Sequence, residues 1–124
     1  FFEEFVHDYT EDGDEFLQVD LNNVLEKIIP NQTDYGQYTY PGEKHYEAVE
    51  SWPDAEVYLP GGDRTQLFNC DAHLKSTILG SSETFEVADG KLGVGTTGYI
   101  YFVDFDRTRS RKRKCKIIIM GEEA

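Results

Sequence analysis

The stretch GYIYFVDFDRTRSRKRKCKIIIM, residues 98–120, contains two apolar runs on either side of a basic segment. The first run is aromatic and the second is rich in isoleucine, and both compositions favour extended strands. Charged residues between two such runs are typical of a solvated connection. The stretch therefore predicts two strands, 98–105 and 114–120, joined by a basic hairpin tip.

Similar short apolar segments recur from about residue 35 onward, and turn-forming residues separate them. Short strands at this spacing are typical of antiparallel sandwiches and barrels. The predicted fold class is therefore mainly β, an antiparallel β-sandwich or barrel with one N-terminal amphipathic helix. The remaining candidate strands are 36–40, 55–59, 64–70, 72–79 and 84–88.

The expected helix spans residues 20–29. Asp20 is a suitable N-cap and Pro30 ends the segment. An apolar stripe at helical spacing supports it, formed by Leu17, Leu21, Val24, Leu25 and Ile28. The chain divides into an acidic aromatic arm, 1–19, and one globular domain, 20–124, which is β-rich over 35–121.

The sequence contains motifs that resemble cofactor and metal sites, but the residues around them do not fit such sites. The run from Gly93 to Gly98 matches a dinucleotide-binding fingerprint, but a predicted strand follows it where that motif needs a helix. The histidines His7, His45 and His73 form no metal-ligand pattern, and no histidine follows Cys115 as a blue-copper site would require. We expect a protein that is not an enzyme and holds no cofactor or metal.

The charge is unevenly distributed along the chain. The net charge is −12, yet residues 107–116 carry seven of the twelve basic residues and no acid. Charged patches of this size steer association with partners. One hypothesis is a heparin or polyanion site, and another is self-assembly between the acidic body and the basic tip. The negative charge of the remaining chain disfavours nucleic acid as a partner. In the polyanion hypothesis and in the self-assembly hypothesis, the contact residues are Arg107, Arg109, Arg111, Lys112, Arg113 and Lys114.

The acidic arm gives the leading hypothesis. Its aromatic and acidic residues, Phe2-Glu3-Glu4-Phe5 and Asp8-Tyr9, resemble the tails by which leech hirudin-type inhibitors occupy an anion-binding exosite of thrombin. The resemblance covers fewer than ten residues. It implies a secreted binding protein, an inhibitor or antagonist, whose partner is a protein with a basic surface patch. Phe2, Glu3, Glu4, Phe5, Asp8 and Tyr9 would make the contact.

Three further features favour a secreted protein. Cys70 and Cys115 are the two cysteines and are expected to form a disulfide, with two buried free thiols as the alternative. Asn31 begins a glycosylation sequon, and the chain starts at Phe1 rather than Met. The apolar runs are too short to span a membrane.

Overall fold

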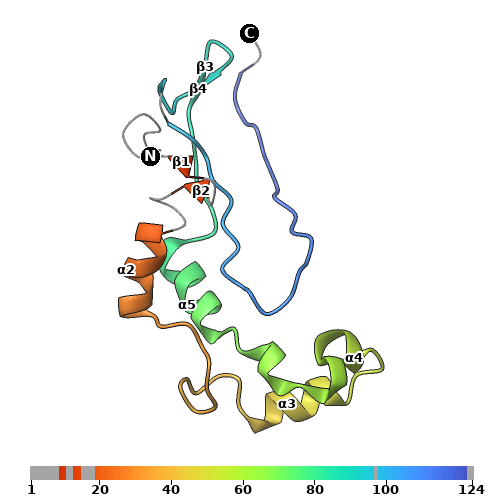
Figure 1. Cartoon of the computed structure of the whole chain (residues 1–124). Coiled ribbons are helices and arrows are strands. Elements are labelled where there is room, and N and C mark those ends of the chain that lie inside the picture. Colours follow the sequence, from red (N-terminus) through yellow and green to blue (C-terminus); the bar gives the residue numbers. More distant parts are fainter. Residues whose placement is uncertain (1–8, 11–12, 15–18, 97, 123–124) are drawn as a thin grey trace.

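The computed structural model describes residues 9–10, 13–14, 19–96 and 98–122, and within them helices outnumber strands (Figure 1). The strands are four two-residue segments that pair as two antiparallel hairpins. The elements in chain order are β1 (Tyr9–Thr10), β2 (Gly13–Asp14), α2 (Leu21–Ile28), α3 (Glu43–Glu50), α4 (Ala55–Tyr58), η2 (Pro60–Gly62), η3 (Arg64–Leu67), α5 (Cys70–Leu79), β3 (Val87–Ala88) and β4 (Lys91–Leu92).

The prediction of a β-sandwich or barrel is wrong. The segment 72–79 lies in α5, 55–59 coincides with the single helical turn of α4, and 64–70 spans η3 and the start of α5. Ambiguous periodicity explains the error, because a short apolar run fits a helix as well as a strand. In α5 the buried residues are Asp71, Ala72 and Lys75, which share one helical face.

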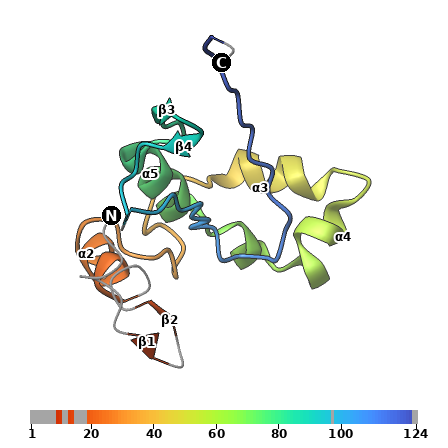
Figure 2. The same ribbon diagram turned by 90° about the horizontal axis from the view of Figure 1, so that it is seen from above.

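The prediction of two C-terminal strands, 98–105 and 114–120, joined as a hairpin is also wrong. Residues 99–120 belong to no helix or strand. Figures 1 and 2 show this segment as a long loop that turns beside α5 and α4. Its apolar residues Ile117, Ile118, Ile119 and Met120 are exposed.

The expected N-terminal helix corresponds to α2, which ends just before Pro30. Asp20 precedes it but makes no side-chain capping hydrogen bond. The buried face is narrower than the predicted stripe, since Leu25 is buried while Val24 and Ile28 are exposed.

The main hydrophobic core lies where α3, α4 and η3 meet. Tyr46 and Val49 of α3 contribute one side. Leu59, Leu67 and Phe68 contribute the other, because the chain reverses at the turn that begins with Pro60. Val49 and Leu67 of this core also line the candidate site described below.

The predicted disulfide is wrong. Both cysteines are free thiols: Cys115 is exposed in the C-terminal loop and Cys70 is half-buried at the start of α5. The Asn31 side chain, predicted to carry a glycan, accepts a hydrogen bond from Lys75 Nζ at 2.8 Å. In the described part of the chain, none of the helices has the length and apolar character that a membrane crossing requires.

Replacing Leu59 tests the core. Leu59 is 2% exposed, whereas Val57, two residues earlier, is 66% exposed. We expect Leu59→Ala to lower the free energy of unfolding by about 2–5 kcal/mol, because it leaves a cavity. The matched change Val57→Ala should cost no more than about 0.5 kcal/mol. Urea unfolding of both variants provides the measurement, and equal losses would contradict this core.

Candidate functional site

The carboxylate of Asp106 attaches the C-terminal loop to the start of α5. Its Oδ1 accepts hydrogen bonds from the backbone N–H of Thr108 at 3.0 Å and from Thr108 Oγ1 at 2.6 Å. Its Oδ2 accepts from Asn69 Nδ2 at 2.9 Å and pairs with Arg111 Nη2 at 3.0 Å. Asn69 immediately precedes α5, so one side chain joins residues 37 positions apart in sequence.

These contacts determine the ionisation of Asp106. Burial by itself would raise the pKa of this carboxyl group, since its side chain is only 7% exposed. The hydrogen bonds from Thr108 and Asn69, together with the charge of Arg111, outweigh burial and hold the pKa below its usual value. Asp106 therefore acts as a buried anion.

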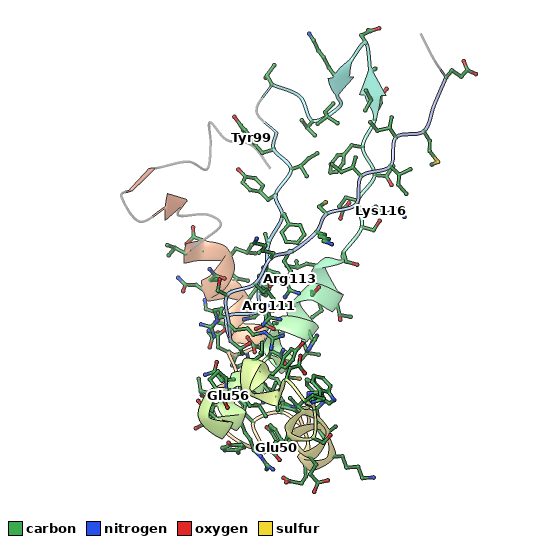
Figure 3. All side chains as sticks on the ribbon, turned by 90° about the vertical axis from the view of Figure 1, so that its right-hand side faces the viewer. Glu50, Glu56, Tyr99, Arg111, Arg113 and Lys116 are labelled. Atoms are coloured by element: carbon green, nitrogen blue, oxygen red, sulfur yellow. The ribbon has the colours of Figure 1, made fainter. Side chains whose placement is uncertain are left out.

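A second ion pair closes the base of the same loop. Arg113 donates from Nε to Asp104 Oδ2 at 2.7 Å and from Nη2 to Oδ1 at 3.2 Å. The hydrogen bonds from Arg113 lower the pKa of Asp104. In Figure 3, Arg111 and Arg113 lie where the loop meets the helices, while Lys116 lies farther along the segment.

The predicted basic hairpin tip is therefore docked on the body of the protein and does not protrude. Arg111 and Arg113 pair with acids, and the Arg109 guanidinium lies 4.4 Å from the centre of the Tyr58 ring. Arg107 lines a cavity, and Lys112 and Lys114 are exposed. The polyanion and self-assembly hypotheses both required a free tip.

A small cavity of about 140 Å³ lies beneath the docked loop. Trp52 and Tyr58 form an aromatic side with their rings edge to face at 5.2 Å. Two arginines line it and no acid does. The complete lining is His45, Val49, Trp52, Tyr58, Gln66, Leu67, Asn69, Thr108, Arg109 and Arg111.

Two polar atoms in residues that line this cavity lack a hydrogen-bond partner in the part of the chain that the structure describes. Asn69 Oδ1 and Arg111 Nε are buried side-chain atoms that have no hydrogen-bond partner within the described residues. Both residues line the cavity. Neither atom is accessible to solvent, so the two arginines of the lining are the charged groups that the cavity offers to a ligand.

A second cavity, of about 380 Å³, lies on the other side of Asn69 and Thr108. Asp71 and Arg107 are its charged lining residues. Asp71 is buried and already pairs with Lys75, whose Nζ lies 3.5 Å from Asp71 Oδ2. Asn69, whose Oδ1 has no hydrogen-bond partner within the described residues, lines this cavity as well.

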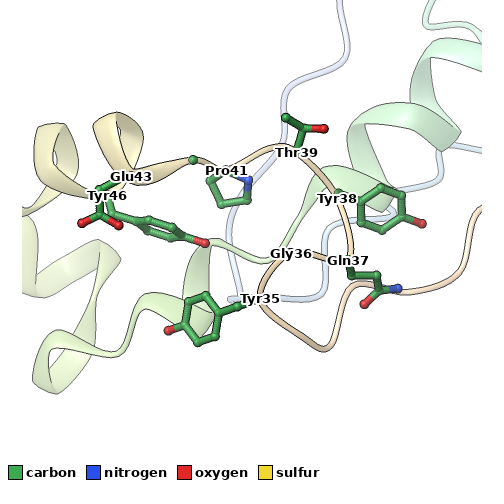
Figure 4. A pocket seen from close by; sticks show the side chains of 9 residues that line it. Tyr35, Gly36, Gln37, Tyr38, Thr39, Pro41, Glu43 and Tyr46 are labelled. Carbon is green, nitrogen blue, oxygen red and sulfur yellow. The ribbon is translucent and has the colours of Figure 1, made fainter.

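A third cavity, of about 540 Å³, opens beside α3 and is lined by Tyr35, Tyr38 and Tyr46 (Figure 4). Its one carboxylate, Glu43, is held by Arg64 Nη1 at 2.9 Å. Arg64 also lies 4.9 Å from the centre of the Tyr46 ring. The charged group is thus satisfied within the chain, and the smaller cavity is the better candidate.

Two of the three histidines, His45 and His73, contact the same tyrosine. Tyr40 OH is 3.3 Å from His45 Nε2, and the Tyr40 ring packs against His73 with centres 5.5 Å apart. In the described residues, no three side chains of the His, Cys, Asp and Glu types gather as metal ligands would. The absence of a metal and a cofactor stays a prediction.

Sequence reasoning identified Arg109 and Arg111 but assigned them to an external surface. It missed Asn69 and Trp52. The series Asp106-Arg107-Thr108 was an available signal, because an Asp followed two residues later by Thr often forms a local side-chain turn. Of the predicted partner-binding residues, Phe2, Glu3, Glu4, Phe5 and Asp8 lie outside the described residues, and Tyr9 lies in β1.

The fold and the site define a mainly helical protein with a polar cavity closed by its C-terminal loop. The chain belongs to the family described as UPF0047 protein YjbQ-like, whose model matches residues 9–122. No solved structure matches the chain.

The chain resembles family members from several organisms. It is 35% identical over 101 residues to a UPF0047 protein of Archaeoglobus fulgidus, covering 82% of this chain and 60% of the relative. It is 42% identical over 59 residues to the UPF0047 protein YugU of Bacillus subtilis, covering 48% of this chain and 43% of the relative. The chain thus spans about half the length of the curated relatives that it matches.

Membership of this family, with relatives in archaea and bacteria, shows that the prediction of a secreted inhibitor glycoprotein is wrong. The hirudin-like tail was a short local resemblance. The family match extends over nearly the whole chain and therefore outweighs it.

Thiol reactivity tests the two free cysteines. Burial, followed by the nearby charge of Asp71, raises the pKa of the Cys70 thiol, so its reactive thiolate is scarce near neutral pH. We expect Ellman's reagent to modify Cys115 rapidly and Cys70 slowly in the native protein. Cys115→Ser should remove the fast phase. Two thiols that react only after reduction would contradict the structure.

Acid sensitivity tests the role of Asp106. Its folded pKa lies below the unfolded value of about 4, so ionised Asp106 stabilises the fold above that value. This stability is lost as the pH falls through the folded pKa. We expect the free energy of unfolding to fall from about pH 5 to pH 3, less steeply in Asp106→Asn. Identical slopes would show that Asp106 has no such role.

Proposed function

We propose that this protein binds a small organic or inorganic anion in the 140 Å³ cavity beneath residues 104–113. The observation that carries the proposal is the lining of this cavity, which includes two arginines, Arg109 and Arg111, and no acidic residue. The two positive charges would attract an anion to this cavity.

The local charge supports an anion. Arg109 and Arg111 both line the cavity, and the nearest carboxylate, Asp106, already accepts hydrogen bonds from Thr108, Asn69 and Arg111. One carboxylate therefore neutralises only one of the two guanidinium charges. The chain as a whole carries −12, so this cavity is a local exception to its electrostatics.

The size of the cavity limits the ligand. Sites for drug-sized molecules measure roughly 300–1,000 Å³. A volume of about 140 Å³ suits an anion with few heavy atoms, such as a carboxylate or phosphate. Trp52, Tyr58 and Val49 add apolar surface on which a short carbon skeleton can pack.

Other aspects of function stay predictions. The sequence predicts that the protein is not an enzyme. It also predicts secretion and a partner protein with a basic surface patch.

A titration with acetate, and separately with inorganic phosphate, tests anion binding. The side-chain N–H signals of Arg111 and Asn69 in NMR spectra report directly on the cavity. We expect saturable shifts in the native protein and at least about tenfold weaker binding in Arg111→Gln, because a charged hydrogen bond is lost. Lys112→Gln removes the same charge from an exposed neighbour and should bind almost normally.

Arg111→Gln also removes the ion pair with Asp106, so its fold must be checked by its NMR spectrum. If neither anion shifts the Arg111 and Asn69 signals in the folded native protein, the proposed function is wrong. Equal weakening by the Lys112 and Arg111 variants would show nonspecific attraction to the basic segment and would also contradict it.

A further inference from the structure

Arg109 is the arginine of the candidate cavity whose hydrogen-bond donors are free. It is partly buried, and it lines this cavity but neither of the other two described above. Within the described residues it makes no hydrogen bond and no ion pair, and its guanidinium lies 4.4 Å from the centre of the Tyr58 ring. A ring face attracts a positive charge but offers no lone pair. The N–H donors of Arg109 therefore remain available for an acceptor from outside the chain.

The other arginine of the lining is already engaged. Arg111 Nη2 donates to Thr108 Oγ1 at 3.1 Å and pairs with Asp106 Oδ2 at 3.0 Å. Its Nε is enclosed by the protein and lies out of reach of a ligand. Arg111 therefore has fewer donors left for a ligand than Arg109 has.

Two aromatic rings hold the Arg109 guanidinium in place. Tyr58 of α4 is partly buried and packs against the main hydrophobic core. Its ring also packs edge to face against Trp52, with ring centres 5.2 Å apart and ring planes at 82°. A planar guanidinium held in one position matches a carboxylate, whose oxygens can accept two parallel N–H bonds from it. The loop thus presents a preformed carboxylate receptor to the cavity.

Trp52 limits the other end of the ligand. It lines the cavity and is 44% exposed, so a ligand can reach its ring. An indole ring favours contact with carbon atoms, because charged oxygens lose their hydration against an apolar surface. Inorganic phosphate has oxygens on every side, whereas a carboxylate with a short carbon chain is charged at one end only. The lining therefore favours the carboxylate over phosphate.

We propose, as a step that rests on the proposed anion site, that its ligand is a short-chain monocarboxylate and that Arg109 is the residue that receives the carboxylate. The carboxylate oxygens accept hydrogen bonds from the Arg109 guanidinium, and the carbon chain lies against Trp52. Tyr58 is a positioning residue, because its ring holds the guanidinium. Arg111 adds a second positive charge at the same cavity.

A homologous series of ligands tests this assignment in the unmodified full chain. Acetate, propionate and butyrate differ by one methylene group at a time. We expect the affinity to rise about two- to fourfold with each methylene, because each one leaves water and contacts Trp52. Butyrate should also bind more tightly than inorganic phosphate. Trp52 is the one tryptophan of the chain, so its fluorescence reports on the cavity, and its emission should move to shorter wavelength as butyrate displaces water.

Two arginine variants locate the carboxylate. Arg109→Lys keeps the positive charge but loses the planar pair of donors, so we expect butyrate to bind about tenfold more weakly. Arg107→Lys is the same chemical change in a residue that lines the second cavity, and it should bind butyrate normally. If both variants bind butyrate as the native protein does, Arg109 does not receive the carboxylate.

Two tyrosine variants test the positioning role of Tyr58. Tyr58→Leu removes the ring face and should weaken butyrate binding, because the guanidinium is no longer held. Tyr58→Phe removes only the hydroxyl group and should keep the native affinity. Equal affinities of the Leu and Phe variants would overturn the role assigned to the ring.

The outcomes separate this inference from the proposed function. Saturable binding of phosphate that is tighter than that of butyrate overturns the monocarboxylate assignment but leaves the anion site intact, and so does equal affinity for acetate and butyrate. If Arg109→Lys does not fold, the Arg109 Nε–H signal in NMR spectra of the native protein decides, since butyrate must shift it. If acetate, butyrate and phosphate all bind without saturation or not at all, both proposals fail.

Discussion

The buried carboxylate of Asp106 is the interaction on which the arrangement of this protein depends. It ties the C-terminal loop to Asn69 at the start of α5 and at the same time holds Arg111 and Thr108. A segment that forms no helix or strand has no backbone ladder to hold it in place. Its position over the core must therefore come from side-chain contacts, and Asp106 makes several of them at once.

The same contacts explain how a strongly acidic chain forms a cationic cavity. Asp104 and Asp106 neutralise Arg113 and Arg111 within the loop, which reduces the repulsion among its basic residues. Arg109 stacks on Tyr58. The basic segment, which suggested an external binding surface, thus becomes the cover of an internal cavity.

Local features of the structure could be predicted from sequence better than its fold. The helix ending before Pro30 was predictable because an apolar stripe and a helix breaker agree. The segments 55–59 and 72–79 were not, because their few apolar residues fit either period. Tertiary contacts determine which residues of these two segments are buried. In the first segment Leu59 is buried and Val57 is exposed. In α5, Lys75 lies on the buried face and contacts Asn31 and Asp71.

The candidate site, like the fold, could be predicted from the sequence only in part. Charge composition pointed to the correct segment, including Arg109 and Arg111. It could not reveal that Asn69 completes the site, because that contact links residues far apart in sequence and depends on the direction of one amide group. An unpaired buried atom is a property of the folded protein and leaves no pattern in the sequence.

The most direct test of this account is a double-mutant cycle between Asp106 and Arg111, measured by urea unfolding. Both side chains are largely buried and lie 3.0 Å apart. The account predicts that Asp106→Ala and Arg111→Ala are strongly non-additive, with a coupling energy of about 1–3 kcal/mol. A coupling below about 0.5 kcal/mol, the range seen for independent sites, would contradict the central role of Asp106.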